Sequence, residues 1–338
     1  MRFTAVLMIL VCVSFAGPLE GGEKWKAASG GMVRLEFQRQ KGVLEMRAFT
    51  GRAPLISRLN DEEKKLTRRM NQLNTKLENY GKHSDEEFQG ELNELGALFF
   101  GPVQDAILKA DVVAIGMSPT MIRFPFEHLH IQGKPLGLQK PVVVYFDHLP
   151  ASSFSYESLR SALALADLTA DPEEACRKAA KRFRNPEYHS LDDIDSEELE
   201  SLKRHDLLLV SAHGDISFGE DDCIEYDEES YAPKTWAQVR PMLAYFDSCQ
   251  VGTSREFIEA FRKAGTQYFV APVTSNEAGN SSTRTINFFF AGLEAGQSPE
   301  HALFQAKLQL ADHYSAARQS PYGKFLYRVM PFRVYRLN

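Results

Sequence analysis

The chain has 338 residues, of which 43% are hydrophobic and 25% are charged, and its formal net charge is -6. This composition is typical of a globular protein and provides enough apolar side chains for one large domain or two small ones. The negative net charge gives no support for a nucleic-acid partner. After the N-terminal segment no apolar run reaches the roughly 18 residues of a membrane span, so we expect none in the mature chain.

The first 16 residues have the pattern of a secretory signal peptide. Arg2 precedes an apolar run at residues 5–16, and the small residues Ser14 and Ala16 fit the positions before a cleavage site. Cleavage would leave Gly17 as the mature N-terminus. The sequence therefore predicts a secreted or periplasmic protein, with an uncleaved short anchor as the alternative.

The cysteines left after removal of Cys12 are odd in number: Cys176, Cys223 and Cys249. Cys12 is a weak candidate for a lipid-acceptor cysteine, because the preceding Val11 is larger than the small residue expected there. An odd count leaves at least one thiol free, which is a liability in an oxidising compartment unless it is used. One alternative is a Cys176–Cys223 disulfide that leaves Cys249 free.

Residues 17–100 predict a leading hairpin and helices. Alternation over Met32–Phe49 indicates a β-hairpin that turns near Lys41-Gly42. Charged stretches indicate helices at Asp61–Tyr80 and Glu86–Phe100, with a third at Val103–Ala110, which already belongs to the following domain. The first helix has a narrow apolar stripe at helical spacing, formed by Leu66, Met70, Leu73 and Leu77.

Residues 101–338 predict one α/β domain in which strands alternate with helices. Strands are expected at residues 112–115, 121–124, 142–146, 162–166, 207–210, 243–246, 268–271 and within 325–334. Helices are expected at residues 172–183, 196–203 with Ser196 as the cap, 254–264 with Gly265 as the C-cap, 282–294 and 299–314. Residues 215–231 are acidic and are predicted to form a loop. This alternation predicts a mostly parallel sheet with helices on both faces.

Two of the predicted buried strands stop at reactive residues. Leu207 to Val210 leads to His213, and Leu243 to Phe246 leads to Cys249. Because reactive groups gather at the carboxyl ends of parallel strands, we expect His213 and Cys249 to face each other at one edge of the sheet. A thiol beside an imidazole is a nucleophile with its base. Each motif taken alone is also compatible with a purely structural role.

Gly214 and the helix that begins near Ser254 complete the predicted site. Gly214 lets a substrate carbonyl approach its backbone N–H, and the N–H of Cys249 would be the second oxyanion donor. The imidazole and the positive end of the helix near Ser254 are expected to favour the thiolate of Cys249. Asp215 is a weak candidate for orienting His213, whereas Asp247 fits a strand end better than a catalytic position.

The two motifs together resemble a known family. Ser211 to Gly214 and Phe246 to Gly252 are similar to the His-Gly and Cys motifs of the caspase-like CHAT peptidases, relatives of separase in the caspase–haemoglobinase fold. Further similarities extend the resemblance over roughly residues 32–338: the leading hairpin, Phe124–Leu129 with residues 133–136, the helix, turn and strand at residues 257–271, and the helix pair at residues 288–306.

The resemblance implies a cysteine endopeptidase that cleaves protein or peptide substrates through a thioester. His213 would be the general base and Cys249 the nucleophile, with Gly214 and Cys249 as oxyanion donors. The chemistry would need no metal and no other cofactor. The sequence gives no indication of the oligomeric state.

The sequence departs from the family where separase-like members have an Asp that receives a basic P1 side chain. Asn276 lies at about that position, and a neutral amide cannot pair with Arg or Lys. Glu277 or the acidic stretch Glu220-Asp221-Asp222 are candidate substitutes. That stretch is equally compatible with a solvated surface or with calcium binding, although its spacing fits no EF-hand.

Two other functions remain open from the sequence. The first is a catalytically inactive CHAT-fold module that binds a protein partner through the Asp61–Tyr80 helix. The second is a hydrolase based on Ser211 or Ser248, but the Gly-x-Ser-x-Gly turn of such enzymes is missing.

Overall fold

The computed structural model describes most of the chain after residue 30. The predicted signal peptide, the hairpin turn at residues 41–42 and most of the acidic stretch at residues 220–222 lie outside the described residues, which are 31–40, 43–50, 54–59, 63–79, 82–152, 154–202, 204–215, 222–226, 229–315 and 321–338. Within these ranges, no helix combines the length and the apolar character that a membrane span requires.

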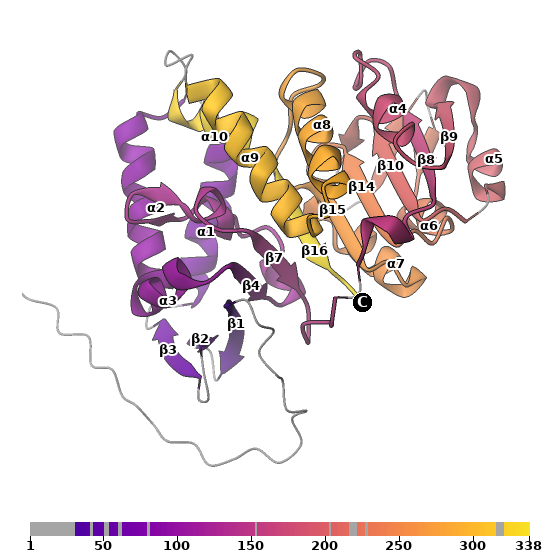
Figure 1. Ribbon diagram of the computed structural model, residues 1–338. Coiled ribbons are helices and arrows are strands. Elements are labelled where there is room, and N and C mark those ends of the chain that lie inside the picture. The colour runs from indigo at the N-terminus through magenta and orange to yellow at the C-terminus, as the bar shows by residue number, and fades with distance from the viewer. Residues whose placement is uncertain are drawn as a thin grey trace, which may run out of the picture.

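One large sheet runs through the described part of the chain (Figure 1). Its strands are antiparallel only at β1–β2, β2–β3 and β15–β16, so the predicted mostly parallel sheet and the leading hairpin are confirmed. In spatial order the strands are β3 (Leu55–Leu59), β2 (Val43–Phe49), β1 (Met32–Gln40), β4 (Val112–Gly116), β7 (Val142–Tyr145), β16 (Phe332–Arg336), β15 (Tyr268–Pro272), β14 (Leu243–Asp247), β10 (Leu207–Ser211), β8 (Ser161–Ala166) and β9 (Asn185–Ser190).

The central strands are continuous apolar runs because helices cover both of their faces. In β14, Tyr245 packs against Phe289 and Phe290 of α8 (Ser281–Glu294). The next residue, Phe246, packs on the opposite face against helix α7 (Arg255–Ala264). Helices α4 (Ala175–Ala180) and α9 (Pro299–Ser315) lie with α8 on one face, and α6 (Pro233–Ala237) lies with α7 on the other (Figure 1).

The N-terminal helices belong to the same body as the sheet. Strand β1 pairs in parallel with β4, so the hairpin continues the sheet without a gap. Helices α1 (Glu63–Glu78), α2 (Asp85–Phe100) and α3 (Gln104–Lys109) join the core that also contains β1. The predicted stripe of α1 is buried, since Leu66, Met70, Leu73 and Leu77 are each at most 1% exposed. That stripe is therefore occupied by intramolecular packing.

The strand expected at residues 121–124 was wrong. The segment instead contains the 3-10 turns η2 (Pro119–Met121) and η3 (Phe126–His128). The carbonyl groups of Ile122 and Phe124 accept hydrogen bonds from the buried Arg333 side chain, at 2.7 Å each. A charged side chain therefore satisfies backbone groups that a strand would pair in a ladder.

The strand expected within residues 325–334 is present only in the last part of that range, as β16. Helix α10 (Tyr322–Val329) precedes β16 and buries Leu326 and Val329 against the core. Short apolar runs do not distinguish a helix from a strand by periodicity alone.

Several small elements were missed or misplaced. Part of the segment predicted as a loop forms a small antiparallel sheet of β11 (Gly214–Asp215), β12 (Cys223–Tyr226) and β13 (Glu229–Tyr231). Helix α5 (Ser196–Ser201) is capped by Asp195, not Ser196, through a capping box with Glu198. Strands β3 and β9 were not predicted.

The remaining short elements are β5 (His130–Ile131), β6 (Lys134–Pro135), η1 (Gly101–Val103), η4 (Leu136–Leu138), η5 (Tyr156–Ser158), η6 (Leu191–Asp193) and η7 (Val251–Thr253).

Candidate active site

The ends of β10 and β14 meet at one edge of the sheet, as the sequence predicted. The two strands are parallel neighbours, and Ser211 is in register with Asp247. His213 and Cys249 each follow that pair by two residues. The fold therefore brings the imidazole-bearing and thiol-bearing segments together.

Gly214 lies directly against the backbone of Cys249. A Cβ atom at position 214 would lie 2.6 Å from the carbonyl oxygen of Cys249 and 3.0 Å from its amide nitrogen. Backbone atoms cannot move away as a flexible side chain can, so only glycine fits at this position. The close approach places the Gly214 and Cys249 backbones side by side, where the sequence predicted two oxyanion donors.

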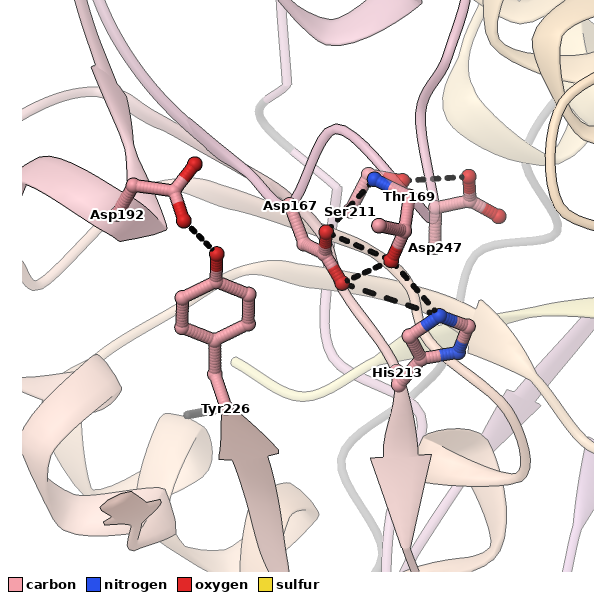
Figure 2. A network of polar contacts seen from close by, with 7 residues as sticks. All are labelled: Asp167, Thr169, Asp192, Ser211, His213, Tyr226 and Asp247. Carbon is pink, nitrogen blue, oxygen red and sulfur yellow. Dashed lines mark hydrogen bonds and ion pairs between the residues drawn. The ribbon is translucent and has the colours of Figure 1, made fainter. Parts of the chain in front are cut away.

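Among the described residues, hydrogen bonds and ion pairs reach the His213 ring at Nε2 and not at Nδ1. Its Nε2 lies 3.1 Å from the hydroxyl oxygen of Thr169 and 3.8 Å from a carboxylate oxygen of Asp167. Figure 2 shows Nε2 directed at these two residues and Nδ1 directed away from them. The His213 side chain is 63% exposed, so it is open to a substrate. Nδ1 is the ring nitrogen that stays available to a thiol.

Asp167 and Thr169 were not predicted as site residues. Asp167 directly follows β8, the neighbour of β10, and its amide donates to the carbonyl of Ser211. Its buried carboxylate accepts hydrogen bonds from the amide and the hydroxyl of Thr169, at 2.7 and 2.8 Å. A signal was present in the sequence, because Asp167 follows a predicted buried strand just as the His213 and Cys249 motifs do.

The surroundings of Cys249 favour the thiol over the thiolate. It is partly buried, and its Sγ lies 3.8 Å from the carbonyl oxygen of Asn276, to which it donates. Burial raises the pKa of Cys249, and the charges of Asp247 and Glu78 raise it further. The expectation that the surroundings favour the thiolate was therefore wrong: η7 separates Cys249 from the start of α7 at Arg255, and the nearby charges are negative.

A tight turn fixes the direction of Cys249. The next residue, Gln250, adopts the left-handed region with φ of 59°. Its carbonyl accepts from the amide and the hydroxyl of Thr253, at 2.7 and 2.8 Å, and its amide donates to Thr274. A left-handed non-glycine residue costs about 1–3 kcal/mol, a cost that the surrounding bonds offset.

Asp247 links the elements beneath the two strand ends. Its buried carboxylate accepts hydrogen bonds from Ser211, Ser282 and Asn276, and Figure 2 draws the bond from Ser211. Burial raises the pKa of Asp247 to about 7, although the hydrogen bonds oppose the shift. Ser211 and Ser248 are at most 1% exposed, so neither hydroxyl is placed as an accessible nucleophile.

The residues expected to bind substrate are less available than predicted. The amide nitrogen of Asn276 donates to Asp247 at 2.7 Å. Glu277 forms an ion pair with Arg328 at 3.0 Å and accepts from Ser281. The backbone of Asp215 pairs with Cys223 in the small sheet, and the carboxylate of Asp167 lies 3.8 Å from Nε2 of His213.

The small sheet beside His213 is tied to the main body. The hydroxyl of Tyr226 donates to Asp192 (Figure 2). The described cysteines Cys176, Cys223 and Cys249 form no disulfide with one another, so the alternative Cys176–Cys223 disulfide is not formed. Within the described ranges, no group of three or more His, Cys, Asp or Glu side chains is arranged to hold a metal ion.

Comparisons with known proteins do not assign the chain to a family. No protein-family model matches it. A comparison with curated proteins finds no match either. The functional conclusion therefore rests on the residues and on their arrangement.

Proposed function

We propose that the chain is a cysteine endopeptidase of the CHAT type, with Cys249 as the nucleophile and His213 as the general base. The observation that carries the proposal is that Ser211 and Asp247 are in register at the ends of two neighbouring parallel strands, with His213 and Cys249 two residues beyond them. An imidazole that is anchored at Nε2, and whose Nδ1 bonds no other described residue, supports the same assignment.

The reaction follows from this arrangement. Nδ1 of His213 takes the thiol proton while the sulfur of Cys249 attacks the substrate carbonyl. The amide groups of Gly214 and Cys249 stabilise the resulting oxyanion, and His213 returns the proton to the leaving amine. Water, activated by the same imidazole, then hydrolyses the thioester and frees the thiol.

Alkylation of the three thiols tests the assignment. An iodoacetamide probe with quantification by mass spectrometry should label Cys249 faster than Cys176, which is fully buried, and faster than Cys223. Replacing His213 with Ala should slow only the reaction of Cys249, because the base is lost and the pKa of the thiol is raised by its surroundings.

A peptide-library cleavage profile completes this test. The wild-type protein should cleave internal peptide bonds, and the Cys249→Ala variant should not. Equal alkylation rates at Cys223 and Cys249, with no cleavage by the wild type, would contradict the proposal and favour a catalytically inactive module that binds a partner.

We further propose that the protein is exported, from the signal-peptide pattern of residues 1–16. N-terminal sequencing of the protein recovered outside the cytoplasm should then begin at Gly17. A product that still begins at Met1 would contradict this proposal.

A further inference from the structure

Glu78, the last residue of α1, reaches the loop beside Cys249 from 197 residues away in the sequence. Its two carboxylate oxygens lie 2.8 and 3.0 Å from the amide nitrogen of Ser275, which donates to them. The carbonyl of the next residue, Asn276, accepts the hydrogen bond that the thiol of Cys249 donates at 3.8 Å. The Ser275-Asn276 segment therefore connects the end of the N-terminal helix to the proposed nucleophile.

The carboxylate of Glu78 is placed to act on the sulfur as a charge. The side chain is partly buried, and burial raises its pKa, against the effect of the hydrogen bonds from Ser275. Among the residues that the structure describes, no Lys, Arg or His forms an ion pair with Glu78, whereas Lys76 of the same helix pairs with Glu91. A charge in partly buried surroundings is screened less than one in water, so its effect extends over several ångströms.

The ionisable groups described around Cys249 come from three elements. Asp247 ends the strand before it, β14, Glu78 ends α1, and His213 follows β10. Burial raises the pKa of Cys249 most, and the charges of Asp247 and Glu78 raise it further. Hydrogen bonds of the Ser275-Asn276 segment oppose this shift without cancelling it. These surroundings favour a thiol that stays bonded to the segment.

We propose that Glu78 is a positioning residue that restrains Cys249 at rest: it holds the Ser275-Asn276 segment against the thiol, and its charge disfavours a negative sulfur. The proposal rests on the peptidase function proposed above and gives the N-terminal helix a role in controlling it. For the reaction, the sulfur must leave the carbonyl of Asn276 and give its proton to His213. Neutralising Glu78 should therefore make the thiol more reactive, whereas the loss of a merely structural contact would not.

The pH dependence of Cys249 alkylation in the full chain tests this proposal. Iodoacetamide reacts with the thiolate, so the midpoint of the rate against pH reports the pKa of the thiol, and the plateau at high pH reports access to the sulfur. The variant Glu78→Gln removes the charge but keeps an oxygen that accepts from Ser275. Its midpoint should lie about one pH unit below that of the wild type, which makes labelling about tenfold faster below both midpoints. Asp247 titrates in every variant, so the difference reports Glu78.

The variant Glu78→Asp separates the charge from the loop anchor. Its carboxylate keeps the charge, but the side chain is one methylene shorter and is drawn away from Ser275. The midpoint should stay near that of the wild type. A residue that only anchored the loop would give the opposite order, with a changed profile in Glu78→Asp and an unchanged one in Glu78→Gln.

A matched control removes a carboxylate from the same pair of helices. Glu94 of α2 forms an exposed ion pair with Arg69 of α1, at 3.0 Å. Glu94→Gln should leave both the midpoint and the plateau of Cys249 alkylation at their wild-type values.

Two results would overturn the proposal. In the first, Glu78→Gln and the wild type have the same midpoint. In the second, which needs no variant, the midpoint of Cys249 in the folded wild type is no higher than that of the same thiol in the urea-unfolded chain, near the ordinary value of about 8.5. Peptide cleavage that Cys249→Ala abolishes would leave the peptidase proposal standing in both cases. Absence of cleavage by the wild type would instead remove the function on which this proposal rests.

Discussion

Thr169 has a single hydroxyl proton, and that proton decides which nitrogen of a neutral His213 is left without a hydrogen. The hydroxyl of Thr169 donates to the carboxylate of Asp167. The oxygen of Thr169 must then accept a hydrogen from Nε2 of His213. Neutral His213 therefore carries its proton on Nε2 and presents a bare Nδ1 to the thiol. Under the proposed function, Asp167 and Thr169 are positioning residues that act through His213.

Removing the Thr169 hydroxyl should weaken the base without removing it. We expect Thr169→Val to lower kcat by about tenfold, the equivalent of one lost hydrogen bond, with little change in KM. Thr169→Ser keeps the hydroxyl and should restore activity to near the wild-type level. Steady-state kinetics on a cleaved peptide measure both. An unchanged kcat in Thr169→Val, or a loss that Thr169→Ser does not restore, would contradict this tautomer assignment.

The sequence could predict that His213 and Cys249 follow neighbouring strands, but not which residues surround them. Each follows an apolar run, and that local pattern was enough to place both segments at one edge of the sheet. Asp167 lies 46 positions before His213 (213 minus 167), and only the order of strands in the sheet makes them neighbours. Glu78, whose charge raises the pKa of Cys249, is farther still, on a helix whose sequence indicates only an apolar stripe and a charged face.

At the scale of secondary-structure elements, the buried carboxylate of Asp247 joins parts of the fold that the active site needs together. It connects the end of β14 to β10 through Ser211, to α8 through Ser282, and to the loop that carries Asn276. Burial raises the pKa of Asp247 to about 7. The hydrogen bonds from Ser282, Ser211 and Asn276 lower this pKa, but they do not cancel the effect of burial. The carboxyl group thus changes its charge near neutral pH.

This pKa predicts a pH-dependent stability. The folded pKa of about 7 lies above the unfolded value of about 3.9, so the native state retains a proton that the unfolded state has released. The associated stabilisation is fully present below about pH 4 and is lost as pH rises through about 7. Between pH 4 and pH 8, the free energy of unfolding of the wild type should fall by up to about 4 kcal/mol relative to Asp247→Asn.

Urea denaturation of both proteins across this pH range measures the difference. The Asn variant keeps the size of the side chain but cannot ionise, so it serves as the reference. Parallel stability curves for the two proteins would show that Asp247 is already charged at low pH and would contradict the prediction.

Elements were predictable where one physical signal dominated. The central strands were found because burial on both faces demands uninterrupted apolar residues. Helix α7 was found because Ser254 and Gly265 mark its ends. Residues 121–124 and 325–329 were misassigned because their structure depends on Arg333 and on tertiary packing, neither of which a local pattern reveals.

At the scale of the whole molecule, a buried ion pair joins residues 206 positions apart. The guanidinium of Arg333 in β16 contacts both oxygens of Glu127 at 2.6 Å and also donates to the carbonyls of Ile122 and Phe124. Burial opposes ionisation of Glu127, but the charge and the hydrogen bonds of Arg333 lower its pKa overall. Buried Lys307 lies close enough to contribute to the same effect, while burial lowers its own pKa to about 8.

Breaking this pair should be costly. We expect Glu127→Gln to lower the free energy of unfolding by about 3–5 kcal/mol, because it leaves a buried guanidinium without its counter-charge. The control Glu259→Gln breaks an exposed ion pair with Arg255 and should cost at most about 0.5 kcal/mol. Chemical denaturation measures both. Similar costs for the two variants would contradict the view that the buried pair holds β16 in place.

The position of β16 has a consequence for how the protein is made. Of all the described strands it is the last to leave the ribosome, yet it lies between β15 and β7 near the middle of the sheet. Until it arrives, the nascent chain carries two separate blocks of strands, each with an open inner edge able to pair with other chains. The block that contains β10 and β14 already holds the segments that carry His213 and Cys249, so these two strand ends can meet before synthesis has supplied the strand that unites the two halves.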